Sequence, residues 1–320
     1  MTPKILDLFC GAGGFAAGFK QEGFEIVAGI DQSYYAFLTY QHNFPHSIFI
    51  NEDIRELHAL DILEKIGDIP DVIIASPPCE PYTSANTFRQ KDPLARLYID
   101  EVGQLVLDAI RIIGDLHSPI FVLENVPDLL AGELKWALTR EFQRVGYEQI
   151  HFNVLRAEDY GTPSRRRRLF ISNIKIKPER RPTELRVQDI LTLPSPTAFH
   201  DVPNHQWCPI SPKKFKKIRR LKPGSALVFY QSATKKTYTN WVRLKPNELA
   251  PTVIGHSRFI HPFEDRVLTV RENARLMGFP DSHRFFGGLD VQYDQVGEAV
   301  PVPLAAAIAH SCLEKILKRS

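Results

Sequence analysis

The stretch Val72-Ile73-Ile74-Ala75-Ser76-Pro77-Pro78-Cys79 decides the fold class of this chain. Its first four residues form a short apolar, β-branched run of the kind found in buried strands, and the two prolines end that strand. Cys79 therefore follows the carboxyl end of a strand, which is where open α/β sheets hold their reacting groups. The segment predicts a buried sheet with a thiol at its functional edge.

Two further apolar runs also end in residues that can carry chemistry. The run Lys4-Ile5-Leu6-Asp7-Leu8-Phe9 leads into the glycine-rich Cys10-Gly11-Ala12-Gly13-Gly14-Phe15, and the run Ile120-Phe121-Val122-Leu123 leads into Glu124-Asn125-Val126. The carboxyl ends of parallel strands meet at one edge of a sheet. We therefore expect a cofactor loop, the thiol of Cys79 and the acid Glu124 to share that edge.

Runs of the same type recur along the chain with helix-length segments between them. This alternation predicts an α/β fold with a doubly wound, mostly parallel sheet. After Ile174 prolines become frequent and helical periodicity fades, which predicts a boundary to a second, smaller and irregular domain. The expected strands are Lys4–Phe9, Glu25–Ile30, Ser47–Ile50, Val72–Ala75, Ile120–Leu123, His151–Leu155 and Leu169–Ser172, and the clearest expected helices are Leu97–Leu116 and Glu133–Val145.

The composition is that of an ordinary soluble protein. The 320 residues are 43% apolar and 24% charged, with a formal net charge of +3, and no segment approaches the roughly 20 apolar residues that cross a bilayer. The amino terminus enters a strand without the apolar stretch of a signal peptide, so the cytoplasm is the expected location. The four cysteines are scattered, which argues against a metal site and against disulfides.

Taken together, these segments resemble the prokaryotic DNA (cytosine-5) methyltransferases. Asp7–Gly14 looks like the cofactor motif of that family, Pro77–Cys79 like its nucleophile motif and Glu124–Val126 like its acid motif. Three later blocks extend the resemblance over nearly the whole chain, apart from about 175–240: Tyr160–Arg168, Leu268–Asp281 and Gln295–Pro301. The resemblance implies a catalytic and cofactor-binding domain at 1–174, a target-recognition domain at 175–267, and a hinge and C-terminal helix at 268–320 that return to the first domain.

The glycines and two acids define a candidate cofactor site. The glycines leave room for a ligand at a helix start, and a tight turn that needs positive φ is the alternative. Asp31 ends the second strand, from which a carboxylate reaches ribose hydroxyls, and Asp53 ends the third, with a helix cap as its alternative. A nucleoside with an amino-acid tail fits best. The resemblance implies S-adenosylmethionine, bound by Phe9, Gly11, Ala12, Gly13, Gly14, Asp31, Gln32, Asp53, Ile54, Pro78, Glu298 and Val300.

Methylation at carbon 5 of cytosine requires prior addition of a nucleophile at carbon 6, and Cys79 is the candidate. Glu124 would hold a proton against ring nitrogen 3. Arg166 and Arg168 alternate in an extended segment and would point into the same pocket, with Arg168 toward base oxygen 2. A water would accept the carbon-5 proton.

Such an enzyme must turn the target nucleotide out of the duplex. The polar segment Glu80–Leu97 is the expected loop over the flipped base. Side chains of this loop are candidates to contact the DNA backbone or to fill the vacated space, and a solvated loop is their alternative: Ser84, Asn86, Arg89, Gln90 and Lys91.

The region before Leu268 is expected to choose the DNA sequence. Its basic cluster Lys213–Lys222, with Phe215 and Ile218 spaced as anchors, suits contacts with phosphates, and a solvated basic helix is the alternative. We expect a monomer that acts on double-stranded DNA, either in a restriction-modification system with a separate endonuclease or as a solitary methylase. The candidate base readers are Gln231, Lys235, Lys236, Tyr238, Asn240 and Arg258.

Four residues depart from the family pattern: Glu80, Ser164, Met277 and Glu298. The two glutamates put the details of loop closure and cofactor contact in doubt. A tRNA methyltransferase with the same motif set is the nearest alternative function. A non-catalytic DNA-binding homologue is another, although it would be expected to lack Cys79, Glu124 or the arginines. We expect no metal.

Overall fold

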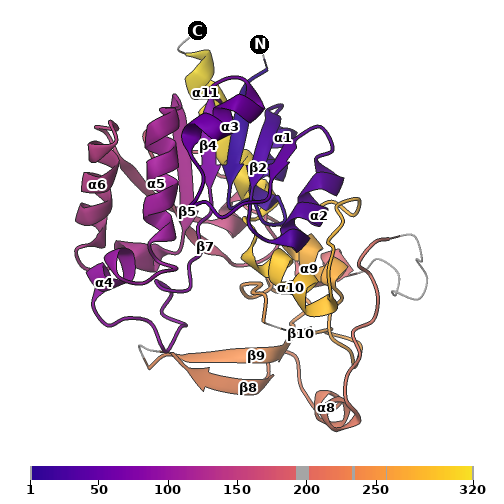
Figure 1. Cartoon of the computed structure of the whole chain (residues 1–320). Coiled ribbons are helices and arrows are strands. Elements are labelled where there is room, and N and C mark those ends of the chain that lie inside the picture. Colours follow the sequence, from indigo (N-terminus) through magenta and orange to yellow (C-terminus); the bar gives the residue numbers. More distant parts are fainter. Residues whose placement is uncertain (1, 192–201, 233–234, 257, 319–320) are drawn as a thin grey trace.

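The computed structural model describes residues 2–191, 202–232, 235–256 and 258–318. A seven-stranded sheet forms the centre of the larger part of the molecule, and a three-stranded sheet lies beyond the carboxyl edge of its parallel strands (Figure 1). The order of the large sheet is β3-β2-β1-β4-β5-β7-β6. Its strands are β1 (Lys4–Leu8), β2 (Glu25–Ile30), β3 (Ile48–Ile50), β4 (Val72–Ala75), β5 (Ile120–Asn125), β6 (His151–Arg156) and β7 (Arg167–Ser172).

The large sheet is doubly wound. Strands β1 to β5 run parallel, and β7 is antiparallel to its neighbours β5 and β6. The chain moves outward from β1 to β3 and then returns to β4 beside β1, so the topological switch point lies between β1 and β4, where ligands bind in open sheets. The predicted fold class is confirmed.

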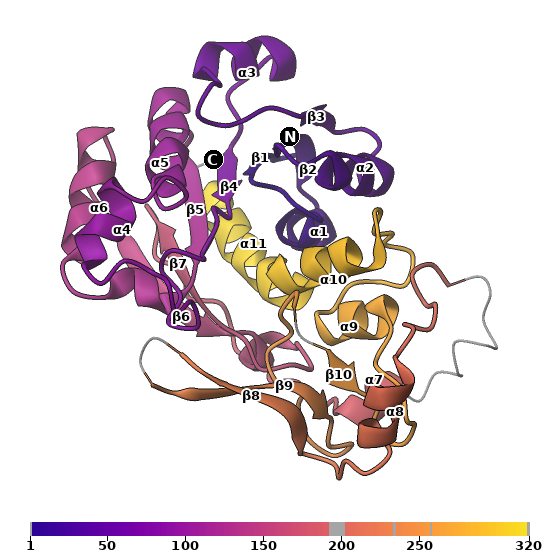
Figure 2. The ribbon, with the colours of Figure 1, turned by 60° about the horizontal axis from the view of Figure 1, so that its bottom comes forward.

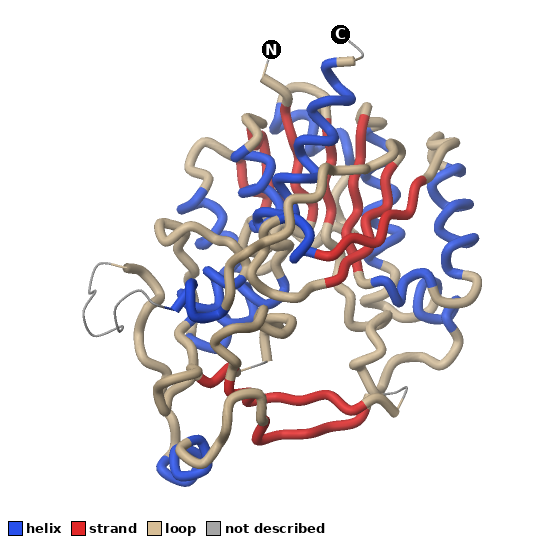
Figure 3. Tube along the Cα trace, turned by 180° about the vertical axis from the view of Figure 1, so that it is seen from behind, coloured by secondary structure: helices blue, strands red, loops and turns tan. Residues whose placement is uncertain are grey.

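Helices cover both faces of the sheet, which explains why β4 is apolar at every position. Ile73 and Ala75 face one hydrophobic cluster with α3 (Ala59–Ile66), α5 (Leu105–Leu116) and α6 (Leu134–Arg144). Val72 and Ile74 face a second cluster with α1 (Gly14–Gln21), α2 (Tyr34–Asn43) and α11 (Val302–Leu317). The view from behind shows α11 lying against the sheet (Figure 3).

The last helix packs on the first. A Cβ placed on Gly18 of α1 would lie 2.4 Å from the Cβ of Ala305 on α11, so the two helices touch at their backbones. The expectation that no segment approaches a membrane span is wrong by length and composition alone, because Leu289–Leu317 is long and apolar enough to cross a bilayer. In the structure this stretch consists of two helices, α10 (Leu289–Glu298) and α11. Of its most apolar segment, 56% is buried inside the protein. It therefore packs as a core element.

The single helix expected over Leu97–Leu116 is wrong, because the structure has two helices there, α4 (Pro93–Tyr98) and α5. Asp100 accepts hydrogen bonds from the backbone N–H groups of Val102 and Gly103 and so holds a turn between them. A Cβ on Gly103 would lie 1.8 Å from the backbone oxygen of Arg96. Only glycine allows this close return of the chain.

The smaller sheet has the order β10-β9-β8 and stands among short helices. A third hydrophobic cluster joins residues on both sides of the expected limit at 267/268, such as Leu244 and Leu276. The domain limits therefore stay a prediction. The elements of this part are α7 (Val187–Leu191), α8 (Pro212–Ile218), β8 (Ala226–Gln231), β9 (Thr237–Arg243), β10 (Phe259–Ile260) and α9 (Val270–Leu276).

The basic helix α8 has one of its two expected anchors. Ile218 is fully buried, whereas Phe215 is 40% exposed, so the anchoring role of Phe215 is wrong. The helix is also held by Lys214, whose ammonium lies 3.7 Å from the ring centre of Trp241 on β9.

Candidate active site

The loop that carries Cys79 is fixed to both neighbouring strands. The N–H of Ser76 donates to the carbonyl of Leu8 at the end of β1 (3.1 Å), and the side-chain amide of Asn125 at the end of β5 donates to the carbonyl of Pro77 (3.1 Å). Figure 2 brings this edge of the sheet forward. The sequence placed Asn125 in a motif but gave it no role; it joins the nucleophile loop to the acid motif.

The acid and the second arginine form a buried ion pair. Glu124 is 6% exposed, and its Oε1 lies 2.9 Å from Nε of Arg168 on the adjacent strand β7. Burial raises the pKa of Glu124, and the charges of Arg168 and Arg166 oppose that rise without cancelling it. A carboxyl group of this kind retains a proton more readily than one in water.

The thiol of Cys79 is half-buried and predominantly protonated. Burial raises its pKa to about 11; the charge of Arg168 opposes this rise, and those of Glu80 and Glu124 add to it. At pH 7 only about one such thiol in ten thousand is ionised. The free protein therefore holds Cys79 mainly as the neutral thiol.

Arg166 is buried, and its guanidinium binds backbone carbonyls. Its guanidinium donates to the carbonyls of Val253 (2.8 Å), Gly297 (2.8 Å) and Glu298 (3.2 Å). Burial lowers its pKa to about 9, so it remains charged at neutral pH. Arg166 thus ties the start of β7 to the end of α10. Its Nε is buried without a hydrogen-bond partner among the described residues.

The glycines after β1 have different functions in the turn. Gly11 has φ +47° and open space where a Cβ would stand, and its N–H donates to Asp31 (3.0 Å). A Cβ on Gly13 would meet the ring of Phe44 at 2.3 Å, and one on Gly14 would meet the carbonyl of Val300 at 2.5 Å. Gly11 leaves an open cradle, whereas Gly13 and Gly14 permit tight packing. The positive φ of Gly11 and Gly13 agrees with the tight-turn alternative, and the role of these glycines in binding a cofactor stays a prediction.

The two acids follow the next strands along the same edge. Asp31 accepts hydrogen bonds from the backbone of Gly11 and Ser33. Asp53 accepts from Nε of Arg55 (3.0 Å), which lowers its pKa. The helix-cap alternative for Asp53 is wrong, because α3 begins only at Ala59 after the N-cap His58. Beside these acids Ile54 is buried and Gln32 is exposed.

The other expected cofactor residues lie around the same loop. Ala12 and Val300 are buried, Phe9 and Pro78 are half-buried, and Phe9 has φ +57°. Glu298 is solvent-exposed, but the surrounding protein and the charges of Glu80, Asp294 and Asp31 raise its pKa to about 7. The two glutamates that depart from the family pattern thus repel each other across the site.

Two residues of this edge were missed by sequence reasoning. His283 is buried and its Nε2 lies 2.9 Å from the carbonyl oxygen of Ala12, and burial lowers its pKa to about 3, so the ring is neutral. Asp7 is buried, with Oδ1 unpartnered among the described residues. Asp7 lay within a quoted motif, whereas no sequence signal pairs His283 with a residue 271 positions away.

Ser164 and Met277, the other two residues that depart from the family pattern, have structural roles. The hydroxyl of Ser164 donates to the carbonyl of Leu276 at the end of α9 (2.7 Å), and both Ser164 and Met277 are fully buried. They pack the arginine segment against α9. Among the described residues, neither one makes a hydrogen bond to the edge that carries Cys79.

Two of the candidate base readers are engaged within the protein. The side chain of Asn240 binds the backbone of His256, Trp241 and Arg258. The guanidinium of Arg258 lies 3.8 Å from the ring centre of Tyr293 and pairs with Asp290. Gln231, Lys235 and Lys236 are exposed and Tyr238 is half-buried.

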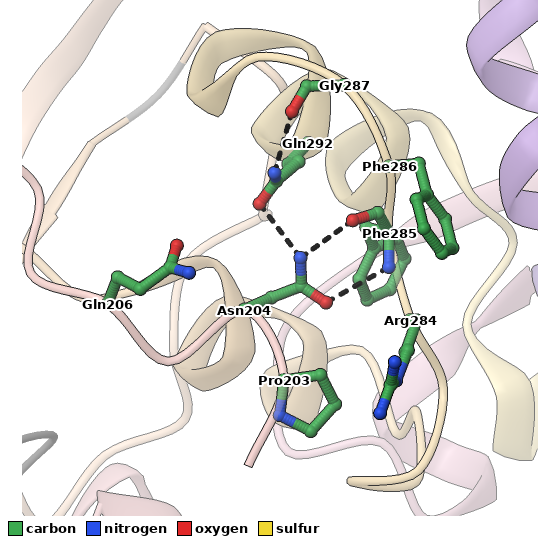
Figure 4. A pocket seen from close by; sticks show the side chains of 8 residues that line it. All are labelled: Pro203, Asn204, Gln206, Arg284, Phe285, Phe286, Gly287 and Gln292. Carbon is green, nitrogen blue, oxygen red and sulfur yellow. Dashed lines mark hydrogen bonds between the residues drawn. The ribbon is translucent and has the colours of Figure 1, made fainter. Parts of the chain in front are cut away.

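A separate pocket of about 390 Å³ lies between the segment at Asn204 and the start of α10 (Figure 4). The Asn204 amide donates to Phe285 (2.7 Å) and Gln292 (2.9 Å) and accepts from the N–H of Phe285 (3.0 Å). These polar groups satisfy one another's hydrogen bonds, so we interpret the pocket as part of the packing between these two segments and not as a ligand site. Within the described residues no His, Cys, Asp and Glu side chains cluster as a metal site would require.

Comparison with known proteins agrees with this geometry. Residues 3–314 match the family model of C-5 cytosine-specific DNA methylases. A Methanocaldococcus jannaschii protein designated type II methyltransferase M.MjaORF1200P is 41% identical, with 98% of each chain covered. Type II methyltransferase M.DdeI of Desulfomicrobium norvegicum is 30% identical, with 96% of this chain and 87% of that protein covered.

Solved structures show the same fold. A DNA modification methyltransferase encoded within an Escherichia coli prophage superposes with a TM-score of 0.75 at 24% identity, covering 99% of this chain and 100% of that one. Dnmt2 methyltransferase of S. pombe gives 0.65 at 16% identity, with 99% of each chain covered. The chain belongs to the C-5 cytosine-specific DNA methylases and is a DNA cytosine-5 methyltransferase.

Proposed function

We propose that this enzyme methylates carbon 5 of a flipped-out cytosine within a specific duplex sequence, through a covalent bond between Cys79 and carbon 6. The observation that carries the proposal is the meeting of Cys79, Glu124 and Arg168 at the sheet edge, with the 2.9 Å ion pair beside the half-buried thiol. Each residue type there suits one step of the reaction.

The steps follow from the protonation states at this edge. The thiol of Cys79 gives its proton to a water as its sulfur adds to carbon 6, and Glu124 supplies a proton toward ring nitrogen 3, which the raised pKa of that carboxyl favours. Carbon 5 then takes the methyl group that the donor would supply, a water removes the proton from carbon 5, nitrogen 3 returns its proton to Glu124, and the thiolate leaves and regains a proton from water. Arg168 orients Glu124 and would donate toward base oxygen 2. Arg166 acts as a positioning residue between β7 and α10.

The family implies S-adenosylmethionine as the methyl donor. The carboxyl edges of β1, β2 and β3 suit it, because Gly11 leaves an open cradle and Asp31 and Asp53 offer acceptors for hydroxyl and amino groups. An edge with these acids matches a ligand with a positive sulfonium and no phosphate. We propose contacts from Phe9 and the glycine turn to the methionine part, from Asp31 to the ribose, and from Asp53, Ile54 and Gln32 to the adenine.

The relatives named type II methyltransferases favour a role in restriction and modification, in the cytoplasm and on double-stranded DNA. Bisulfite sequencing of plasmid DNA from cells that express the chain tests this proposal. We expect protected cytosines at one short recurrent sequence, and none with Cys79→Ser. Unmodified DNA with modified tRNA would instead establish the RNA alternative.

A further inference from the structure

Charge is distributed very unevenly along the chain. Residues 202–247 contain eleven lysines and arginines and no aspartate or glutamate. The whole chain holds 40 basic and 37 acidic residues, so the rest of it has 29 and 37 and a formal net charge of −8. A whole-chain charge close to neutral therefore conceals one strongly basic segment. Such an asymmetry indicates a surface for a polyanion.

The basic cluster Lys213–Lys222 is carried by a firmly held element of the smaller sheet. Nη2 of Arg243 on β9 donates to the carbonyl of Ile218 at the end of α8 (2.9 Å) and pairs with Asp265 (2.6 Å). Ile218 is fully buried. At the start of the helix Ser211 accepts a hydrogen bond from the N–H of Lys214 (3.4 Å). The cluster is therefore presented by a folded element, and its position relative to the hairpin of β8 and β9 is fixed.

Most charges of the basic cluster face the solvent without an acidic partner. Within the described part of the chain Arg219 is the one member in an ion pair, with Asp265 at 3.8 Å, and both of these side chains are exposed. Like charges held this close together repel one another, so the cluster does not stabilise the fold by its charges. The other exposed members are Lys213, Lys214, Lys216, Lys217, Arg220 and Lys222.

The basic cluster lies on the far side of the smaller sheet from the catalytic edge. Figures 1 and 3 show α8 beyond the hairpin of β8 and β9, on the side turned away from the large sheet. The other end of the hairpin reaches the catalytic part, where the hydroxyl oxygens of Tyr238 and Ser84 lie 3.4 Å apart. A duplex whose target base lies at Cys79 is therefore on the opposite side of the hairpin from α8.

We propose that the basic cluster binds the phosphates of a second duplex DNA segment, separate from the segment whose cytosine is methylated. Lysine and arginine contacts to phosphate give affinity without reading sequence. A protein partner fits less well, because lysine is depleted at the core of protein interfaces. The second contact keeps the enzyme on DNA while the catalytic side exchanges one segment for another. The inference rests on the proposed action on double-stranded DNA and adds a surface that the chemical step does not use.

The test fills the catalytic side first. Enzyme is bound covalently to a short target duplex that carries 5-fluorocytosine, and a fluorescent duplex without the target sequence is then titrated into this complex. We expect wild type to bind the second duplex with a strong dependence on salt. Replacing three cations, Lys213→Gln, Lys216→Gln and Lys217→Gln together, should weaken this binding about tenfold or more and reduce the slope of log K against log salt by about 2–3.

The matched control removes the same number of charges at the other end of the molecule. Lys65→Gln, Lys315→Gln and Lys318→Gln change exposed side chains of α3 and of the end of α11. This variant should bind the second duplex within about twofold of wild type, as expected for surface changes away from a contact. An equal loss in the control variant would show that net charge alone, and not the basic cluster, determines the binding.

A trapped wild-type complex that binds no second duplex would overturn the proposal, as would a cluster variant that binds it as wild type does. Poly-glutamate binding in place of duplex DNA would reject DNA as the partner. A second measurement compares methylation of the short duplex and of a plasmid with one target site. The cluster variant should lose rate on the plasmid and not on the short duplex, and an equal loss on both would place the cluster at the target segment. Wild type that forms no trapped complex and methylates no duplex would instead reject the proposed function.

Discussion

Nε of Arg168 and Oε1 of Glu124 lie 2.9 Å apart across two antiparallel strands. The pair sets the protonation of the acid, because burial raises the pKa of Glu124 and Arg168 is the largest effect that lowers it. The enzyme therefore holds a carboxyl group whose protonated form is favoured by burial and whose ionised form is favoured by Arg168. That property is what proton transfer to a ring nitrogen requires.

Arg168→Ala should raise the pKa of Glu124 further. A raised folded-state pKa gives stability that is lost as pH rises through it, so the variant should lose about 3–5 kcal/mol at pH 8 and less at pH 5. Urea unfolding at both pH values measures the difference. Arg167→Ala, an exposed change on the same strand, is the control. A pH-independent loss would show that the pair does not govern the titration of Glu124.

Arg166→Ala should weaken cofactor binding more than DNA binding. The change removes donors to the carbonyls of Val253, Gly297 and Glu298, and a hydrogen bond from a charged group contributes about 1.5–3 kcal/mol. We expect about a tenfold or greater rise in the Kd for S-adenosylhomocysteine by calorimetry. An unchanged Kd with a lost reaction rate would instead place Arg166 at the base.

Gly11→Ala and Gly14→Ala should separate ligand binding from folding. A Cβ at position 11 would enter open space, so the first variant should bind cofactor poorly and lose only about 1–2 kcal/mol from its positive φ. A Cβ at position 14 would meet the carbonyl of Val300 at 2.5 Å, so the second should lower Tm. Equal behaviour of the two in melting and binding experiments would refute this division.

Glu298→Gln should flatten the dependence of stability on pH. The pKa of Glu298 is raised to about 7, so its favourable contribution is present below its unfolded pKa and is lost as pH rises through 7. The variant should melt at a higher temperature than wild type at pH 8, and the difference should shrink at pH 5. Asp294→Asn, which removes a neighbouring charge, should give a smaller change in the same direction.

The sheet was predictable because strands buried on both faces are apolar throughout, as β4 is. Cys79 follows β4 and Glu124 lies at the end of β5. Because parallel strands end at the same edge of a sheet, the sequence predicted that these two residues lie close together. The contacts of Arg166 with residues 87 and 131 positions away have no local signal. The contact of His283 with the carbonyl of Ala12 and the contact between the hydroxyls of Tyr238 and Ser84 also have no local sequence signal. The sequence did not predict the break between α4 and α5. Apolar periodicity shows which positions face the core, but it does not show that the backbone at Gly103 passes close to the carbonyl of Arg96.

The most direct test of the account is trapping on duplex DNA that carries 5-fluorocytosine at the target. Fluorine blocks loss of the carbon-5 substituent, so the adduct should persist as a band stable to denaturant. Wild type and Cys208→Ser, which removes another half-buried thiol, should both form it in the presence of S-adenosylmethionine, and Cys79→Ser should not. A stable adduct formed by Cys79→Ser would contradict the assignment of Cys79 as the nucleophile.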